Sequence, residues 1–157
     1  MILEIRKYPD PILKKKCKPV RKITQEDIEL IGNMFETMRQ NGGVGLSACQ
    51  VGVLKQIAVV GIGKKSLVLI NPKILSRKGV RISEEGCLSI PGVFLKIKRA
   101  EEIEVEALNQ DGKKFKIKAQ GLLSYCLQQE IDHLNGILIL NRISIFKRIK
   151  LKLSKKI

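Results

Sequence analysis

The sequence is poor in aromatic residues, histidine and long apolar runs, and these shortages exclude several classes of protein. Aromatic residues make up 4% of the 157, and none is tryptophan, so a platform for stacking nucleic-acid bases is hard to build. The longest apolar runs, such as residues 67–70, are far too short to cross a bilayer. Residues 1–10 carry no apolar signal-peptide core. We therefore expect a cytoplasmic protein with no membrane partner.

Paired cysteine motifs and linkers are also missing. The four cysteines are scattered without C-x-x-C spacing, which favours reduced thiols in a chain long enough to bury a core. No repeat or Pro/Gly/Ser-rich tract divides the chain, so we expect a single domain over residues 1–157.

Positive charge is abundant. Lysine and arginine outnumber acidic residues 30 to 15, giving a net charge of +15, and no acidic residue follows Asp132. Such an excess attracts polyanions without sequence preference, but no zinc-finger or RNA-recognition signature accompanies it. We expect no specific DNA binding, and a solvated lysine-rich surface is the simplest interpretation.

Helices and strands are predicted from apolar periodicity and from turn residues. Thr24 is a predicted N-cap, and the helix that follows is expected to end at residues 41–43. Residues 56–62 and 66–70 are rich in β-formers, and Asn71-Pro72 is expected to end the second strand.

The second half of the chain continues with a hairpin and two helices. Alternating residues on either side of Asn109–Gly112 predict paired strands. A helix is expected over about 122–134, and another over about 144–156 that turns Ile149 and Leu153 toward the body and its lysines outward. Strands gathered between helices indicate an α+β fold, with mostly antiparallel strands around the central helix.

The helix over 122–134 carries the polar residues with the greatest chemical potential. Gln129 and His133 are four residues apart and share a face, with Glu130 beside them. The H-E-x-x-H motif uses this spacing to aim two imidazoles at one metal, but here the first position is glutamine. Alone, the fragment is weak evidence, because a single helical histidine is more often structural.

Two further segments strengthen the case. Gly43-Val44-Gly45-Leu46-Ser47-Ala48-Cys49-Gln50 contains glycines that allow a ligand to approach the main chain, although it could be an ordinary helix end and loop. Glu85-Gly86-Cys87-Leu88-Ser89 places a thiol among turn residues, although it could be a buried cysteine in a bend.

The three segments, in this order and at these separations, resemble the peptide deformylases. They match the family patterns G-x-G-L-A-A-x-Q, E-G-C-L-S and H-E-x-x-H, and similarity extends over nearly the whole chain. The resemblance implies a metal-dependent amidase that removes the formyl group from N-formylmethionine at the start of nascent peptides.

The resemblance also implies roles for individual residues. The family holds ferrous iron, with nickel or zinc as alternatives, and uses a water activated by the cation. The metal ligands implied are Cys87, His133 and Gln129. Glu130 is the implied proton carrier, Gln50 and the backbone N–H of Leu88 the implied oxyanion donors, and Val44 and Gly45 the lining of the peptide groove.

The glutamine leaves other functions open. An amide oxygen is a poorer ligand than imidazole for iron, nickel or zinc, so activity could be reduced, or the protein could bind N-terminal peptides without efficient turnover. A thiol hydrolase built on Cys87 and His133, with Glu130 orienting the imidazole, is a less favoured alternative. The basic C-terminal helix is a candidate contact with ribosomal RNA.

Overall fold

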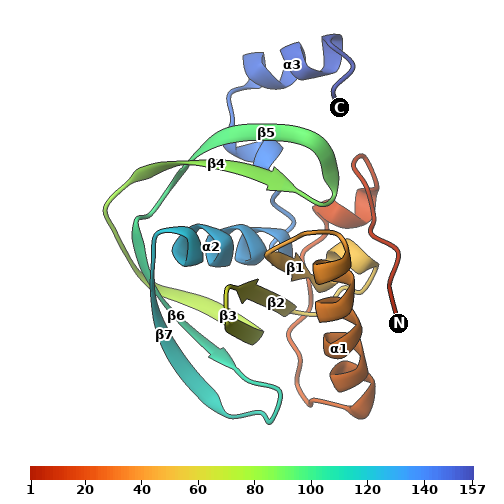
Figure 1. Ribbon diagram of the computed structural model, residues 1–157, viewed down its shortest axis with the longest axis vertical. Helices are drawn as coiled ribbons and strands as arrows, with labels where there is room; N and C mark the ends of the chain where they lie inside the picture. Colours follow the sequence, from red (N-terminus) through yellow and green to blue (C-terminus); the bar gives the residue numbers. More distant parts are fainter.

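The computed structural model describes residues 1–157, which form three α-helices and seven strands (Figure 1). The helices are α1 (Gln25–Gln40), α2 (Leu122–Leu134) and α3 (Ile145–Leu153). The strands are β1 (Gly45–Ser47), β2 (Ile57–Ile62), β3 (Lys65–Lys78), β4 (Arg81–Cys87), β5 (Ile90–Arg99), β6 (Glu102–Leu108) and β7 (Lys114–Gln120). Three short 3-10 segments, η1 (Pro11–Lys14), η2 (Ala48–Val51) and η3 (Ile139–Arg142), connect them.

The strands form two antiparallel sheets with α2 between them. Five strands are ordered β1-β2-β3-β6-β7, and β4 pairs with β5 separately. Figure 1 shows α2 crossing the middle of the molecule, with the β4–β5 sheet on one side and the larger sheet on the other. The predicted α+β class and the antiparallel arrangement around a central helix are confirmed.

Helix α2 is central because its apolar residues have a sheet to cover. Leu127, Ile131 and Leu134 belong to a buried cluster that also contains residues of β2, β3, β6 and β7. Removing such side chains from water is the main favourable term in folding. The remaining sides of α2 are left to face the β4–β5 sheet and β1, where they carry the polar residues of the site.

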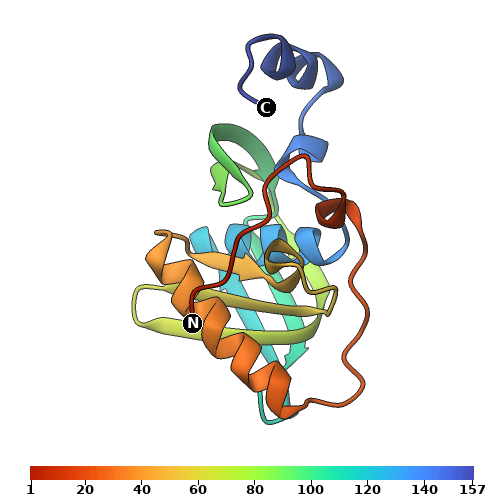
Figure 2. The same ribbon diagram turned by 90° about the vertical axis from the view of Figure 1, so that its right-hand side faces the viewer.

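The N-terminal helix follows its sequence signals closely. Thr24 and Asp27 form a capping box, in which each side chain bonds the backbone N–H of the other residue. The helix ends where the sequence predicts, at Asn41. Helix α1 packs with β1 and β2 through Met34 and Met38, so its C-terminus delivers the glycine-rich segment to the site (Figure 2).

One strand prediction needs correction, and one strand was not predicted. Strand β3 does not end at Asn71-Pro72 but runs on to Lys78, with its register to β6 shifted between Ile70 and Lys73. A β-bulge absorbs the residues that break the ladder, and the Asn71 amide bonds both the N–H and the C=O of Val20. Strand β4 was not predicted, because its polar and glycine content resembles a loop.

The expected orientation of the C-terminal helix is wrong. Ser144 caps α3 as predicted, but Ile149 is 48% exposed and Leu153 80% exposed. Leu151 contacts the body instead, against the cluster around Leu138 and Ile139. Both views show α3 standing apart from the larger sheet (Figures 1 and 2), and the exposure of Ile149 and Leu153 shows that its apolar stripe meets solvent. None of the three helices combines the length and the apolar character needed to cross a membrane.

Candidate active site

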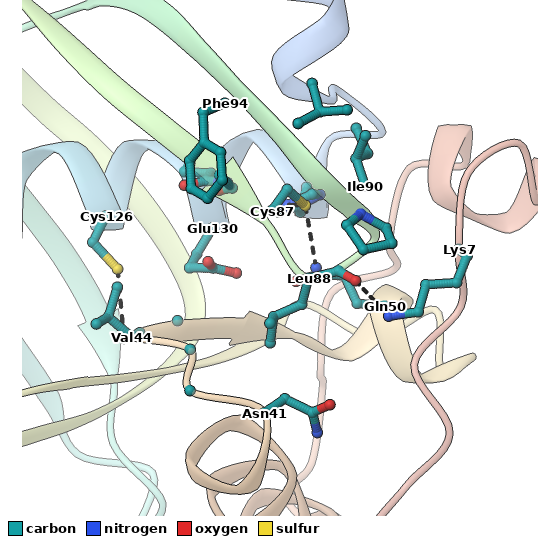
Figure 3. A pocket seen from close by; sticks show the side chains of 18 of the residues that line it. Lys7, Asn41, Val44, Gln50, Cys87, Leu88, Ile90, Phe94, Cys126 and Glu130 are labelled. Carbon is teal, nitrogen blue, oxygen red and sulfur yellow. Dashed lines mark hydrogen bonds between the residues drawn. The ribbon is translucent and has the colours of Figure 1, made fainter. Parts of the chain in front are cut away.

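A cavity of about 480 Å³ opens beside α2, between β1 and the turn that joins β4 to β5 (Figure 3). The three segments singled out in the sequence all contribute to its lining. Every residue predicted for the site lies there, namely Val44, Gly45, Gln50, Cys87, Leu88, Gln129, Glu130 and His133.

Cys87 and His133 form the centre of this cavity. The Sγ atom of Cys87, at the end of β4, lies 3.4 Å from Nε2 of His133 on α2. Two ligands of one tetrahedral ion, at about 2.3 Å for sulfur and 2.0 Å for nitrogen, are roughly 3.5 Å apart. The observed separation therefore fits a shared metal ion without rearrangement.

Burial keeps both groups neutral when no metal is bound. It raises the pKa of the Cys87 thiol to about 12, against the opposing hydrogen bond from the Ser89 backbone. It lowers the pKa of His133 to about 4. A thiolate–imidazolium pair, which a cysteine hydrolase needs, is disfavoured by both shifts.

Gln129 is turned toward the backbone of the cysteine segment. Its Nε2 donates to the carbonyl oxygen of Gly86 at 2.9 Å, so only the amide oxygen is left as a metal-binding atom. Accordingly, no group of three His, Cys, Asp or Glu side chains surrounds a common point in the chain. The donor set fits a divalent ion with two good ligands, Cys87 and His133, and one weak one.

Glu130 is buried beside the pair, where a proton carrier would be needed. One carboxylate oxygen lies 2.6 Å from the Ser47 hydroxyl, and the side chain is enclosed by the protein. Burial raises the pKa of Glu130 to about 8, although the Ser47 hydrogen bond opposes this shift. A carboxyl group with a pKa near neutrality can both accept and return a proton.

The orientation of the Gln50 amide is fixed by the chain itself. Its oxygen accepts the Ser47 backbone N–H at 2.9 Å, which forces the NH2 group toward the cavity. There Nε2 lies 3.1 Å from the Ser89 hydroxyl and 3.7 Å from the Cys87 sulfur (Figure 3). Gln50 therefore presents a donor beside the Cys87–His133 pair.

Strand β1 offers a free edge to the cavity. It pairs only with β2, and the Val44 carbonyl accepts the Gly61 N–H at 2.8 Å. Because hydrogen bonding alternates along an antiparallel strand, the Gly45 N–H and C=O point away from β2. A Cβ at Gly45 would lie 2.8 Å from the Glu130 carboxyl carbon and 2.9 Å from the Cys126 sulfur, so only glycine fits.

A buried ion network that no local sequence pattern indicates supports the cavity from behind. The Arg99 guanidinium donates two hydrogen bonds to Glu85, at 2.8 and 2.9 Å, and one to Asp132 at 2.6 Å. Glu85 is two residues from Cys87, and Asp132 precedes His133. The network thus ties the β4 segment to α2 near the point where Cys87 and His133 approach each other.

Lys7 and the hydroxyl of Ser47 make further contacts in the site that the sequence did not indicate. The Lys7 ammonium donates to the Leu88 carbonyl at 2.6 Å and anchors the N-terminal segment to the cysteine turn (Figure 3). Ser47 bonds Glu130. Both contacts join residues more than 80 positions apart, so no local pattern announces them.

Comparison with known proteins agrees with this architecture. The sequence model described as polypeptide deformylase matches residues 2–148. The peptide deformylase of Halothermothrix orenii is 51% identical over 144 residues, covering 90% of this chain and 94% of the relative. That of Thermodesulfovibrio yellowstonii is 49% identical over 152 residues, covering 94% and 92%.

Solved structures of the same kind superimpose closely. The crystal structure of a peptide deformylase from Legionella pneumophila has a TM-score of 0.93 at 43% identity, covering 99% of this chain and 95% of that one. The Ehrlichia chaffeensis enzyme in complex with actinonin gives 0.93 at 41% identity, covering 99% and 97%. This chain therefore belongs to the polypeptide deformylase family, whose members remove the N-formyl group from nascent proteins.

Proposed function

We propose that the cavity between α2, β1 and β4 is where this chain removes the formyl group from the formylmethionine that begins new proteins. The observation that carries the assignment is the 3.4 Å approach of Cys87 and His133, with Glu130 buried beside them. In this reaction the oxygen of water adds to the formyl carbon, and the carbon–nitrogen bond breaks. Formate and a free methionine amine are the products.

Cys87, His133 and the amide oxygen of Gln129 would hold one divalent ion. Thiolate and imidazole suit iron, nickel and zinc, and we propose ferrous iron as the resident ion. When bound, the ion supplies Lewis-acid polarisation of the formyl carbonyl. Since burial keeps Cys87 protonated in its absence, loading the site releases a proton.

The remaining residues handle protons, charge and binding. Glu130 takes the proton from the attacking water and returns it to the leaving nitrogen. The amide of Gln50 and the N–H of Leu88 stabilise negative charge on the formyl oxygen. The peptide adds as a strand to the open edge at Gly45, while Val44 contacts it with its exposed side chain.

Gln129 is proposed to weaken the site without abolishing it. The amide nitrogen is bound to Gly86, and an amide oxygen is a poorer donor than imidazole. The deciding experiment compares the wild type with Gln129→His, under anaerobic iron or added nickel, on a formyl-Met-Ala peptide. We expect metal retention and rate to rise together, by about 10-fold or more.

A matched control separates ligation from the mere addition of an imidazole. Gln120→His places a histidine at the exposed end of β7, outside the cavity, and should change neither metal retention nor rate. Equal retention in Gln129→His and the wild type would show that Gln129 is no ligand. A wild type that binds formyl-Met-Ala but turns none over with metal present would instead identify a peptide-binding protein.

Helix α3 is proposed to dock on the ribosome, where formylated chains emerge. Such docking would mean that the protein works in the cytoplasm. Exposed lysines on α3 would contact ribosomal RNA phosphates, and no acidic residue follows Asp132 to oppose them.

The variant Lys147→Gln/Lys150→Gln/Lys152→Gln should lose co-sedimentation with ribosomes at low salt. Lys113→Gln/Lys114→Gln/Lys116→Gln removes equal charge from the β6–β7 hairpin and should not. Equal loss in both would indicate a general charge effect.

A further inference from the structure

A second cavity, of about 610 Å³, lies on the other side of α2 and has no part in the proposed reaction. Helix α2 presents one set of residues to the first cavity, including Gln129 and His133, and another to the second. The second cavity is bounded by the β3–β4 connection and by the end of β5. The residues contributed by α2 are Gln128, Ile131 and Asp132, and Asn135 follows at its C-terminal end.

Cations dominate the lining of this cavity. Arg77, Lys98, Arg99 and Arg142 line it, together with a single acidic residue, Asp132. Arg99 is satisfied by the buried ion network, and Arg142 holds Asp132 with two hydrogen bonds, of 2.5 and 3.0 Å. Lys98 alternates along β5 with the buried Arg99, so its side chain points to the other face of the sheet. Arg77 takes part in no ion pair. The lining is therefore positive, with Arg77 unpaired and Arg142 partly exposed.

The rest of the lining is apolar. Ile74 of β3, Val80 in the β3–β4 turn, Ile131 of α2 and Ile137 beyond it contribute aliphatic side chains. Val80 is 70% exposed, which is a cost for a valine that nothing covers. A small inorganic anion would neutralise the cations but leave these aliphatic side chains exposed to water.

We propose that the second cavity binds an organic anion that carries a short apolar chain, such as a medium-chain carboxylate. The anionic group would meet Arg77 and the exposed part of Arg142, and the chain would cover Val80 and Ile137. A volume of about 610 Å³ lies within the range of small-molecule sites. RNA phosphates would also bind the cations, but they carry no apolar chain to cover the aliphatic side chains of the lining.

Occupancy of this cavity is linked to the reaction site through Asp132. A carboxylate ligand competes with Asp132 for Arg142, whose side chain is 42% exposed. Asp132 is bonded to Arg99 and adjoins His133, while Arg99 holds Glu85 near Cys87. A ligand that draws Arg142 away loosens the support of both proposed metal ligands.

The binding test uses the full chain loaded with zinc and three probes: hexanoate, acetate and 1-hexanol. Calorimetry measures affinity, and methyl NMR signals of Ile74, Ile131 and Ile137 locate the site apart from Ile90, which lines the first cavity. We expect hexanoate to bind and shift the first three signals, and to bind at least about tenfold more tightly than either control. If acetate binds as tightly as hexanoate, the site recognises charge alone. If 1-hexanol binds as tightly as hexanoate, the site recognises apolar surface alone. Either result overturns the proposal.

Variants test the lining without touching the reaction machinery. Arg77→Gln should weaken hexanoate binding about threefold or more, and Val80→Ser about threefold. Lys113→Gln removes the same charge elsewhere and should have no effect. If Lys113→Gln weakens binding equally, the cavity is not the site.

The linkage arm rests on the proposed metal site and is read separately. Cobalt affinity, followed by thiolate absorption, should fall about fivefold in saturating hexanoate. By reciprocity, hexanoate should bind the cobalt-loaded chain more weakly than the apoprotein by the same factor. Hexanoate binding with unchanged cobalt affinity would overturn the linkage, whereas a chain that binds hexanoate but no cobalt would count against the proposed metal site alone.

Discussion

Helices α2 and α3 are both short and both carry an apolar stripe, yet they lie in opposite environments. Nine of the thirteen residues of α2 are buried, and none of the nine in α3 is. The stripe of α2 packs on residues of the larger sheet, while that of α3 meets solvent. The difference teaches that amphipathicity defines a face but does not say whether a surface exists to cover it.

The largest expected effect lies in α2 and concerns proton transfer. Glu130→Ala should lower kcat on formyl-Met-Ala by about 10²- to 10⁴-fold, because positioned acid–base groups contribute about that much. Removal of Lys147, Lys150 and Lys152 from α3 should leave this rate unchanged. A Glu130→Ala enzyme with a normal rate would contradict the assigned mechanism, provided that its metal content matches the wild type.

Stability should separate the two helices next. Leu127→Ala removes a fully buried side chain from the main core and should lower the free energy of unfolding by about 2–5 kcal/mol. Leu153→Ala removes an exposed one and should change it by less than about 0.5 kcal/mol. Urea denaturation of the two variants measures both. Comparable losses would mean that α3 packs against the body in solution.

The pH dependence of stability should reveal the buried acid of α2. Burial raises the pKa of Glu130 to about 8, so the folded apoprotein keeps a proton that the unfolded chain loses above about pH 4.5. That contribution is present at low pH and is lost as pH rises through 8. His133, whose pKa burial lowers to about 4, acts oppositely only between about pH 4 and 6.5.

Between about pH 6.5 and 8, Glu130 therefore acts without this compensation. The apoprotein should lose stability across this window, and Glu130→Gln should remove the loss because its amide does not titrate. Thermal unfolding at several pH values measures the change, with Lys150→Gln on α3 as the control. An equal slope in the wild type and Glu130→Gln would show that Glu130 is not buried in the uncharged form.

The smallest expected effect is that of the variant Lys147→Gln/Lys150→Gln/Lys152→Gln on catalysis. The triple lysine variant should match the wild type on a short free peptide within about twofold, while ribosome co-sedimentation falls. An equal loss of both would connect α3 to the reaction site and erase the contrast between the two helices.

Local chemistry made much of the molecule predictable. The Thr24 cap, the hairpin around Asn109–Gly112 and the bounds of α2 depend on neighbouring residues, and the structure confirms them. The patterns around Gly45, Cys87 and His133 identified the family, which the comparisons confirm. The single domain over residues 1–157 and the role of each site residue stay predictions.

Contacts between distant segments were decided only by the tertiary structure. The bulge that carries β3 past Pro72 depends on Asn71 bonding Val20, and the ion network of Arg99 joins three separate elements. In α3 it is Leu151, and not Ile149 or Leu153, that packs on the cluster around Leu138 and Ile139. Sequence by itself determined the segments, their periodicity and the chemistry of the motifs, because these depend on nearest neighbours. Which faces meet, and therefore which polar groups are buried and shifted in pKa, depends on a competition for surface that only the folded chain settles.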